Sequence, residues 1–242
     1  MFRFKAANAN TGASTLNVNA LGAKAIQLRG RALTGGEIGA KHIVAVVFDG
    51  TQFQMISPVS AGGWELVHEQ TPGGGVVQID FTTGFTTAYD AWMFVLTDVL
   101  PDTDNRILHM QISDDGSTFE ADATVYEYNV VAQRSATAGI TNKANSQGDT
   151  KIILTGGIGS ASGEGASGIV VAHNLRDAPA GGNQFTWQIE CFDNTATAVL
   201  DRCSGCGSHN GGAGPILGVR FLMSANNISG GSRIAMYGLR RT

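Results

Sequence analysis

The stretch Phe185-Thr186-Trp187-Gln188-Ile189-Glu190-Cys191 alternates apolar and polar side chains without interruption. Successive side chains of a β-strand point to opposite faces of its sheet, so this alternation predicts a strand with one face buried. The polar positions between them indicate that the other face meets water, as is usual in antiparallel sheets.

Alternating or continuously apolar runs of strand length recur along the chain, at residues 92–97, 107–112, 219–223 and 233–239. Residues 124–131 lie in a stretch with few glycines that has room for a helix, but their β-branched and aromatic side chains favour a strand. Glycine-containing pairs between the runs predict turns. These pairs are Asp115-Gly116, Gly156-Gly157, Gly181-Gly182, Gly211-Gly212 and Gly230-Gly231.

The composition supports an all-β protein. Glycine accounts for 33 of 242 residues, about twice its usual share of ~7%, and glycine weakens helix interiors. The glycines have no three-residue period, which excludes collagen. Hydrophobic residues make up 43% of the chain, enough for a packed core, so disorder is not expected.

The chain is expected to form two domains, residues 1–60 and 61–242. Residues 43–48 and 52–56 flank Asp49-Gly50, a hairpin signal. A short segment rich in Ser, Pro and Gly follows at 57–63 and resembles a linker. The first domain is near the lower size limit for independent folding, so we expect it to need partner chains. The second is large enough for an antiparallel β-sandwich.

The charge balance argues against several partners. The net charge of −4 gives no electrostatic reason to expect nucleic acid or an anionic membrane. No apolar window approaches the ~20 residues of a membrane span, so membrane insertion is not expected. The first residues lack the apolar run of a signal peptide, which predicts synthesis in the cytoplasm.

A cysteine and histidine cluster is the candidate metal site. Cys203 and Cys206 form a Cys-x-x-Cys pair, His209 follows three residues later, and Cys191 precedes Cys203 by twelve residues. If the pair lies in a short loop, these four side chains have the character of zinc ligands. A Cys203–Cys206 disulfide is a second interpretation. Free thiols are favoured over both, because Cys191 falls on the apolar face of its strand and buried free cysteines are common.

Other chemical motifs are weak, and no enzymatic activity is predicted. Acidic segments at 102–105 and 114–116 offer oxygens for calcium, but Asp and Asn are also ordinary turn residues, and turns are favoured. The glycine-rich segment 156–165 lacks the Gly-Lys-Ser/Thr ending of a phosphate loop, so a surface loop is expected. The carboxylates that a glycosidase would need have no diagnostic spacing. The residues considered are Glu120, Asp122, Glu127 and Glu190.

Two parts of the chain resemble a known class of proteins. The segment Asn8-Ala9-Asn10-Thr11-Gly12, followed by Leu21-Gly22-Ala23-Lys24 and by Asp49-Gly50-Thr51-Gln52-Phe53, resembles virion appendage proteins of tailed bacteriophages. The later segments Ile79-Asp80-Phe81-Thr82-Thr83-Gly84 and Arg233-Ile234-Ala235-Met236-Tyr237-Gly238-Leu239 resemble a second module of phage virions. The resemblance covers residues 2–58 and much of the remainder.

The resemblance implies a virion structural protein, with a small attachment and oligomerisation domain followed by a jelly-roll-type β-sandwich. The expected form is a homotrimeric tail fibre, head fibre or spike on the particle surface. It would be joined to a capsid or tail adaptor protein and take part in host attachment through host-surface polysaccharide. The alternative is a capsid decoration protein that stabilises the head without binding a receptor.

Overall fold

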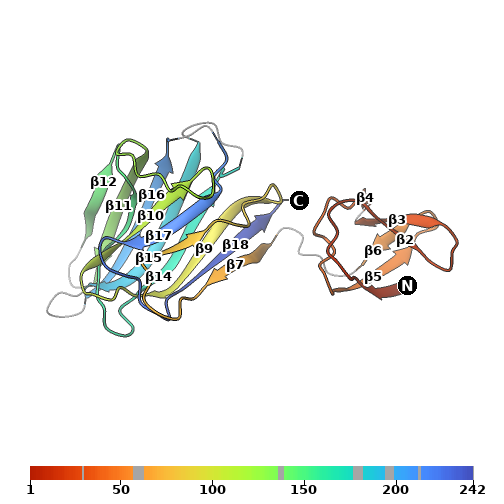
Figure 1. The fold of residues 1–242 in the computed structure, drawn as a ribbon, viewed down its shortest axis with the longest axis horizontal. Helices are drawn as coiled ribbons and strands as arrows, with labels where there is room; N and C mark the ends of the chain where they lie inside the picture. Colours follow the sequence, from red (N-terminus) through yellow and green to blue (C-terminus); the bar gives the residue numbers. More distant parts are fainter. Residues whose placement is uncertain are drawn as a thin grey trace. The chain divides into compact units, whose positions relative to one another are not determined.

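The computed structural model describes residues 1–28, 30–56, 63–135, 139–176, 182–193, 199–211 and 214–241. All regular secondary structure in these residues is β, in eighteen strands, which confirms the predicted all-β class. The chain divides into two compact units, Met1–Ala61 and Gly62–Thr242, coloured red to orange and yellow to blue in Figure 1. The proposed linker at 57–63 lies outside the described residues except for Gly63.

The N-terminal unit is a single sheet in the order β1-β5-β6-β3-β2, with β4 paired to β3. Its strands are β1 (Phe2–Lys5), β2 (Ser14–Asn17), β3 (Ala23–Leu28), β4 (Arg31–Ala32), β5 (Ile43–Phe48) and β6 (Phe53–Met55). The predicted hairpin is confirmed between β5 and β6. Its turn is closed by Asp49, whose Oδ1 accepts hydrogen bonds from the backbone N–H groups of Thr51 and Gln52, both at 2.9 Å.

The C-terminal unit contains two antiparallel sheets. The smaller has the order β13-β10-β17-β8, and the larger has the order β12-β11-β16-β15-β14-β9-β18-β7. The strands are β7 (Trp64–Gln70), β8 (Gln78–Phe81), β9 (Tyr89–Val99), β10 (Arg106–Ser113), β11 (Tyr126–Arg134), β12 (Ile140–Ser146), β13 (Ile152–Ile158), β14 (Ala166–His173), β15 (Asn183–Asp193), β16 (Val199–His209), β17 (Gly218–Met223) and β18 (Arg233–Arg240).

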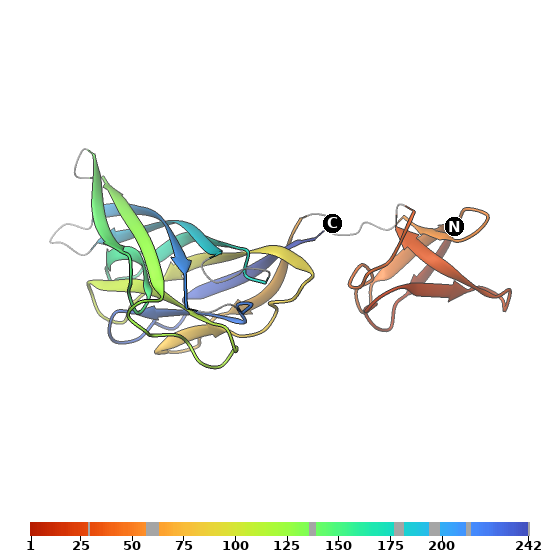
Figure 2. The same ribbon diagram turned by 90° about the horizontal axis from the view of Figure 1, so that it is seen from above.

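The connections between these strands follow a regular plan. When β11–β12 and β15–β16 are set aside, the chain crosses from one sheet to the other at each step between the remaining eight strands, except from β10 to β13, which both lie in the smaller sheet. The two pairs that were set aside lengthen the larger sheet beyond β14. Strands β11 and β12, drawn in green at one end of the unit in Figure 2, form its outer end. The unit's first strand, β7, pairs with its last, β18, at the opposite edge.

The core of this unit lies between the two sheets. Phe94 of the larger sheet meets Phe81 and Phe221 of the smaller sheet, with ring centroids 5.3 and 5.4 Å apart. All three side chains are fully buried, and such edge-to-face contacts add to the free energy gained from burying the rings. The segments predicted as strands at 92–97, 107–112, 185–191, 219–223 and 233–239 all lie within strands, and the segment at 124–131 overlaps β11.

The turn expected at Gly156-Gly157 is wrong, because both residues lie inside β13. Gly157 pairs with Ile107 of β10, and a Cβ atom there would collide with the Asn105 side chain. Glycine in a strand often marks such a close approach rather than a turn. Gly230-Gly231 does form a turn and Asp115-Gly116 lies at a bend in the chain. Gly181 and Gly212 fall outside the described residues.

Candidate functional site

The structure does not bring the four predicted metal ligands together. Cys203 and Cys206 both lie in β16, and their odd spacing places them on opposite faces of the sheet. Cys191 and Cys203 are buried, whereas Cys206 is exposed, and all three are free thiols. Buried His209 has its Nε2 atom 3.0 Å from the Glu120 carboxylate. Within the described residues, no group of three or more His, Cys, Asp or Glu side chains is arranged to hold a metal ion.

The reason is that residues 203–209 form a strand and not the loop on which the zinc interpretation depended. The buried Cys191 and Cys203 are hydrogen-bonded to each other, and this bond together with burial raises the pKa of the Cys191 thiol. A thiol held in this way stays protonated and behaves as a small apolar side chain of the core.

A buried cluster of charges lies near the start of β16, two residues before Cys203. The Asp201 carboxylate is fully buried and accepts a hydrogen bond from Arg134 Nε at 2.8 Å and forms an ion pair with Lys143 Nζ at 3.0 Å. Arg134 also pairs with Asp193. Burial alone would raise the pKa of Asp201, but the two cations outweigh it and lower that pKa. The cluster therefore links β11, β12, β15 and β16.

The outward face of these strands carries the candidate binding site. The strand register places Glu127, Ser208 and Gln184 side by side on β11, β16 and β15. Two residues further along, the same register aligns Asn129, Cys206 and Thr186. These two rows line a groove with a volume of about 400 Å³, which Ser146 and Gln147 close on the β12 side. Small-molecule sites typically have volumes of about 300–1,000 Å³.

The groove surface is mostly apolar, but it carries several hydrogen-bonding side chains that have no partner among the residues that the structure describes. Within the described part of the chain, the side chains of Glu127, Asn129, Gln184, Thr186 and Ser208 make no hydrogen bond. Glu127 is the one formally charged residue among those that line it. Sequence reasoning considered Glu127 only as a catalytic carboxylate and did not single out the amides and hydroxyls. Glu127 and Asn129 alternate with buried residues in the sequence, but the strand that contains Ser208 and the register that joins the three strands were not predictable from it.

The other half of this outer face is apolar. The register continues the row of Thr186 across the larger sheet through Val171 of β14, Met93 of β9, Tyr237 of β18 and Leu66 of β7. A parallel row contains Ile169, Val95 and Ala235. Leu66 and Ile169 are exposed, and Met93, Val95, Val171 and Tyr237 are partly exposed. We call this surface the apolar face.

Six charged side chains on or next to the strands of the apolar face form ion pairs with one another. Glu69 bonds Arg233 at 2.6 Å, and Glu65 bonds Arg240 at 2.8 Å. Asp90 of β9 bonds Arg241, just beyond β18, at 2.5 Å. Because each acid has a basic partner, these six residues add no net charge beside the apolar face.

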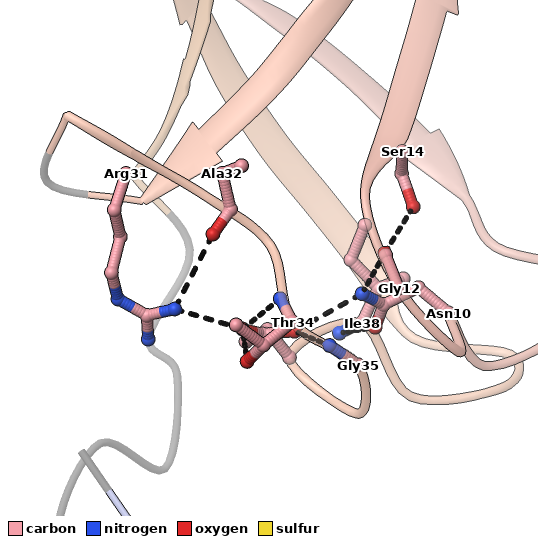
Figure 3. Close-up of polar contacts among 9 residues, drawn as sticks. Asn10, Gly12, Ser14, Arg31, Ala32, Thr34, Gly35 and Ile38 are labelled. Carbon is pink, nitrogen blue, oxygen red and sulfur yellow. Dashed lines mark hydrogen bonds and ion pairs between the residues drawn. The ribbon is translucent and has the colours of Figure 1, made fainter.

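In the N-terminal unit, the Glu37 carboxylate is the centre of a network of polar contacts. Figure 3 shows this network, with the partners Asn10, Arg31, Thr34 and Gly35 labelled. Its carboxylate accepts hydrogen bonds from the backbone N–H groups of Thr34 and Gly35, both at 2.8 Å, and from the Asn10 amide at 3.0 Å. Asn10 belongs to the Asn-Thr-Gly segment, and its Oδ1 atom accepts a hydrogen bond from the Ile38 backbone N–H at 2.8 Å. Burial would raise the pKa of Glu37, but the hydrogen bonds outweigh it and lower that pKa to about 2.

This unit also exposes large apolar side chains. Phe2, Leu21, Ile43 and Phe48 are among them. An apolar groove of about 160 Å³ lies between Phe2, Leu21 and Phe48, with Val18, Gly22, Lys24 and Phe53 completing its lining. Contiguous exposed apolar surface of this kind marks interaction sites.

The acidic segments act within turns. Asp115 Oδ1 accepts hydrogen bonds from the N–H groups of Ser117 and Thr118 at 2.7 and 2.6 Å, which lowers the pKa of Asp115. Asp104 accepts the N–H of Ser160 at 2.7 Å and so joins two loops. Both carboxylates therefore bond to the protein itself, as turn residues do.

No protein family model, curated protein or solved structure matches this chain. In the residues that the structure describes, no helix is long and apolar enough to cross a membrane.

Proposed function

We propose that the chain is a bacteriophage virion structural protein without enzymatic activity. It assembles as a homotrimeric fibre- or spike-type appendage on the particle surface and takes part in host attachment. The N-terminal unit serves attachment to the capsid or tail, and the C-terminal unit is a jelly-roll-type sandwich. Two observations support the fold part of this proposal. Eight strands form two facing four-strand sets in the orders β7-β18-β9-β14 and β8-β17-β10-β13, and the first strand pairs with the last.

The observation that carries the proposal is the apolar face. A monomer that left Leu66, Tyr237, Met93 and Ile169 in water would lose the free energy that burying them provides, about 25 cal/mol per Å². A second copy of the chain is the occupant that fits best. In a trimer, identical charges approach one another around the threefold axis, and here the neighbouring acids and arginines are already paired within one chain. Self-association therefore meets no like-charge repulsion from them.

Sedimentation equilibrium of the full chain tests the assembly. We expect a trimer for the wild type and weaker association, by about tenfold or more, for Leu66→Glu, which places an unpaired charge in the buried interface. Leu66 is 52% exposed, so the substitution leaves the core intact. The matched control is Ile140→Glu, because Ile140 is 72% exposed on β12 and lies outside the apolar face. A monomeric wild type, or equal effects of the two variants, would contradict the proposal.

The position of the protein on the particle tests the appendage role. Gold-labelled antibody against the C-terminal unit should mark tail or vertex structures in electron micrographs. Uniform labelling of the capsid faces, with binding to bare heads but not to cells, would instead establish the capsid decoration role.

A further inference from the structure

We propose that the groove over β11, β16 and β15 binds an uncharged oligosaccharide. This inference rests on the proposed attachment function and names the site and the ligand class that serve it. The groove is distinct from the apolar face, because the hydrogen-bonding side chains of Glu127, Asn129, Gln184, Thr186 and Ser208 are part of its lining.

The chemistry of the lining matches a polyhydroxylated ligand. Gln184 and Asn129 each offer an amide donor and a carbonyl acceptor, and Thr186 and Ser208 each offer a hydroxyl that does both. Glu127 offers two carboxylate oxygens, which can accept from two neighbouring sugar hydroxyls in charge-assisted hydrogen bonds. None of these groups has a partner within the described residues. A sugar could therefore form hydrogen bonds with them without breaking any hydrogen bond inside the protein.

The same features disfavour other ligands. No Lys or Arg lines the groove, and the Glu127 carboxylate would repel a phosphate or sulfate. An extended peptide cannot join the sheet here, because β11, β16 and β15 are each paired on both sides and offer no free strand edge.

The site is already organised before a ligand arrives. Its polar side chains stand on paired strands, and the register fixes their spacing in two rows of three. Binding therefore requires no rearrangement of the backbone, and only the side-chain rotamers have to be ordered. Cys206 lies in the middle of the second row and is exposed, whereas Cys191 and Cys203 are buried. A thiol reagent can therefore reach the groove selectively.

The experiment screens the full chain on an array of neutral hexose and N-acetylhexosamine oligosaccharides, followed by calorimetric titration with the best binder. We expect Gln184→Ala and Glu127→Gln to weaken binding by about tenfold each, since the first removes an amide and the second replaces one charged acceptor oxygen with a neutral donor. Gln188→Ala is the matched control. Gln188 faces outward on the same strand two residues beyond Thr186 but does not line the groove, so its loss should leave affinity unchanged.

Alkylation of Cys206 gives an independent readout. Iodoacetamide should abolish binding of the same oligosaccharide, and the bound oligosaccharide should slow alkylation of Cys206. The inference is overturned if no neutral oligosaccharide binds, if only acidic or phosphorylated ligands bind, or if Gln188→Ala weakens binding as much as Gln184→Ala.

The two proposals fail separately. If the chain is trimeric and lies on virion appendages but binds no neutral oligosaccharide, only the groove inference fails. If the groove binds sugar while the wild type is monomeric and absent from particles, the appendage role fails and the groove inference stands.

Discussion

Glu37 shows how much one side chain can contribute in a unit as small as the first 61 residues. Its carboxylate side chain is only 5% exposed, and it joins the Thr34–Gly35 turn to Asn10. A buried carboxylate is unfavourable unless its oxygens are satisfied, and here several donors satisfy them. The Asn-Thr-Gly segment therefore has a structural role, because it supplies one of the donors.

We predict that Glu37→Gln destabilises the N-terminal unit by about 2–3 kcal/mol at neutral pH, because it removes charge-assisted hydrogen bonds. The pKa of Glu37 is lowered from 4.5 to about 2, so its contribution is complete above pH 4.5 and is lost as the pH falls toward 2. Hydrogen exchange of residues 1–56 in the full chain, measured at pH 7 and pH 3, reports both the destabilisation by Glu37→Gln and its dependence on pH. The variant should match the wild type more closely at pH 3, and exposed Lys24→Gln should change little at either pH.

At the scale of elements, the buried charges connect the two hairpins that lengthen the larger sheet. Arg134 comes from β11, Lys143 from β12 and Asp201 from β16, and Asp193 completes the cluster from β15. Their interactions cross three strand pairings. The same strands carry the groove on the opposite face. The cluster therefore helps to hold together the strands that form the candidate site.

We expect Arg134→Met to lower the free energy of unfolding of the C-terminal unit by about 3–5 kcal/mol, because it leaves the buried Asp201 with one cation. Urea denaturation followed by tryptophan fluorescence measures this. The matched control is Arg202→Met, since Arg202 lies on β16 next to Asp201 but is exposed, with its Glu190 partner 4.0 Å away. That change should cost under about 1 kcal/mol. Similar costs for the two variants would show that the cluster contributes no special stability.

At the scale of the molecule, the outer face of the larger sheet combines two surfaces of different chemistry. One row of paired residues runs from Leu66 through Met93 to Thr186 and Asn129, and it changes from apolar to polar between β14 and β15. A protein with this division can associate through one half of the face while the other half stays open to a ligand.

If the apolar face drives assembly, the association constant should depend weakly on salt and should fall on cooling. Hydrophobic association weakens at low temperature, whereas salt screens interactions between charges. Sedimentation equilibrium at 0.1 and 1 M NaCl should give constants within about threefold of each other. A steep fall with salt would show that ion pairs between chains hold the assembly instead.

The strands were predictable because alternation is a local property of the chain. Residues 185–191 and 233–239 carry it clearly, and both segments lie in strands. Residues 203–209 were misread as a loop because Gly205 and Gly207 interrupt the apolar pattern. Gly205 lies opposite Trp187, and a Cβ there would collide with its ring. The glycine makes room for the ring, a requirement that only the pairing reveals.

The sequence by itself determined the all-β class and the position of most strands, since side-chain periodicity and turn residues act over a few positions. Only the tertiary structure decided which strands are neighbours and in what register. That register separated Cys203 from Cys206 and placed Cys206 in the row of Asn129 and Thr186. It also joined Leu66, Met93 and Tyr237 in the apolar face. Both surfaces depend on contacts between residues far apart in the chain, which a local pattern does not encode.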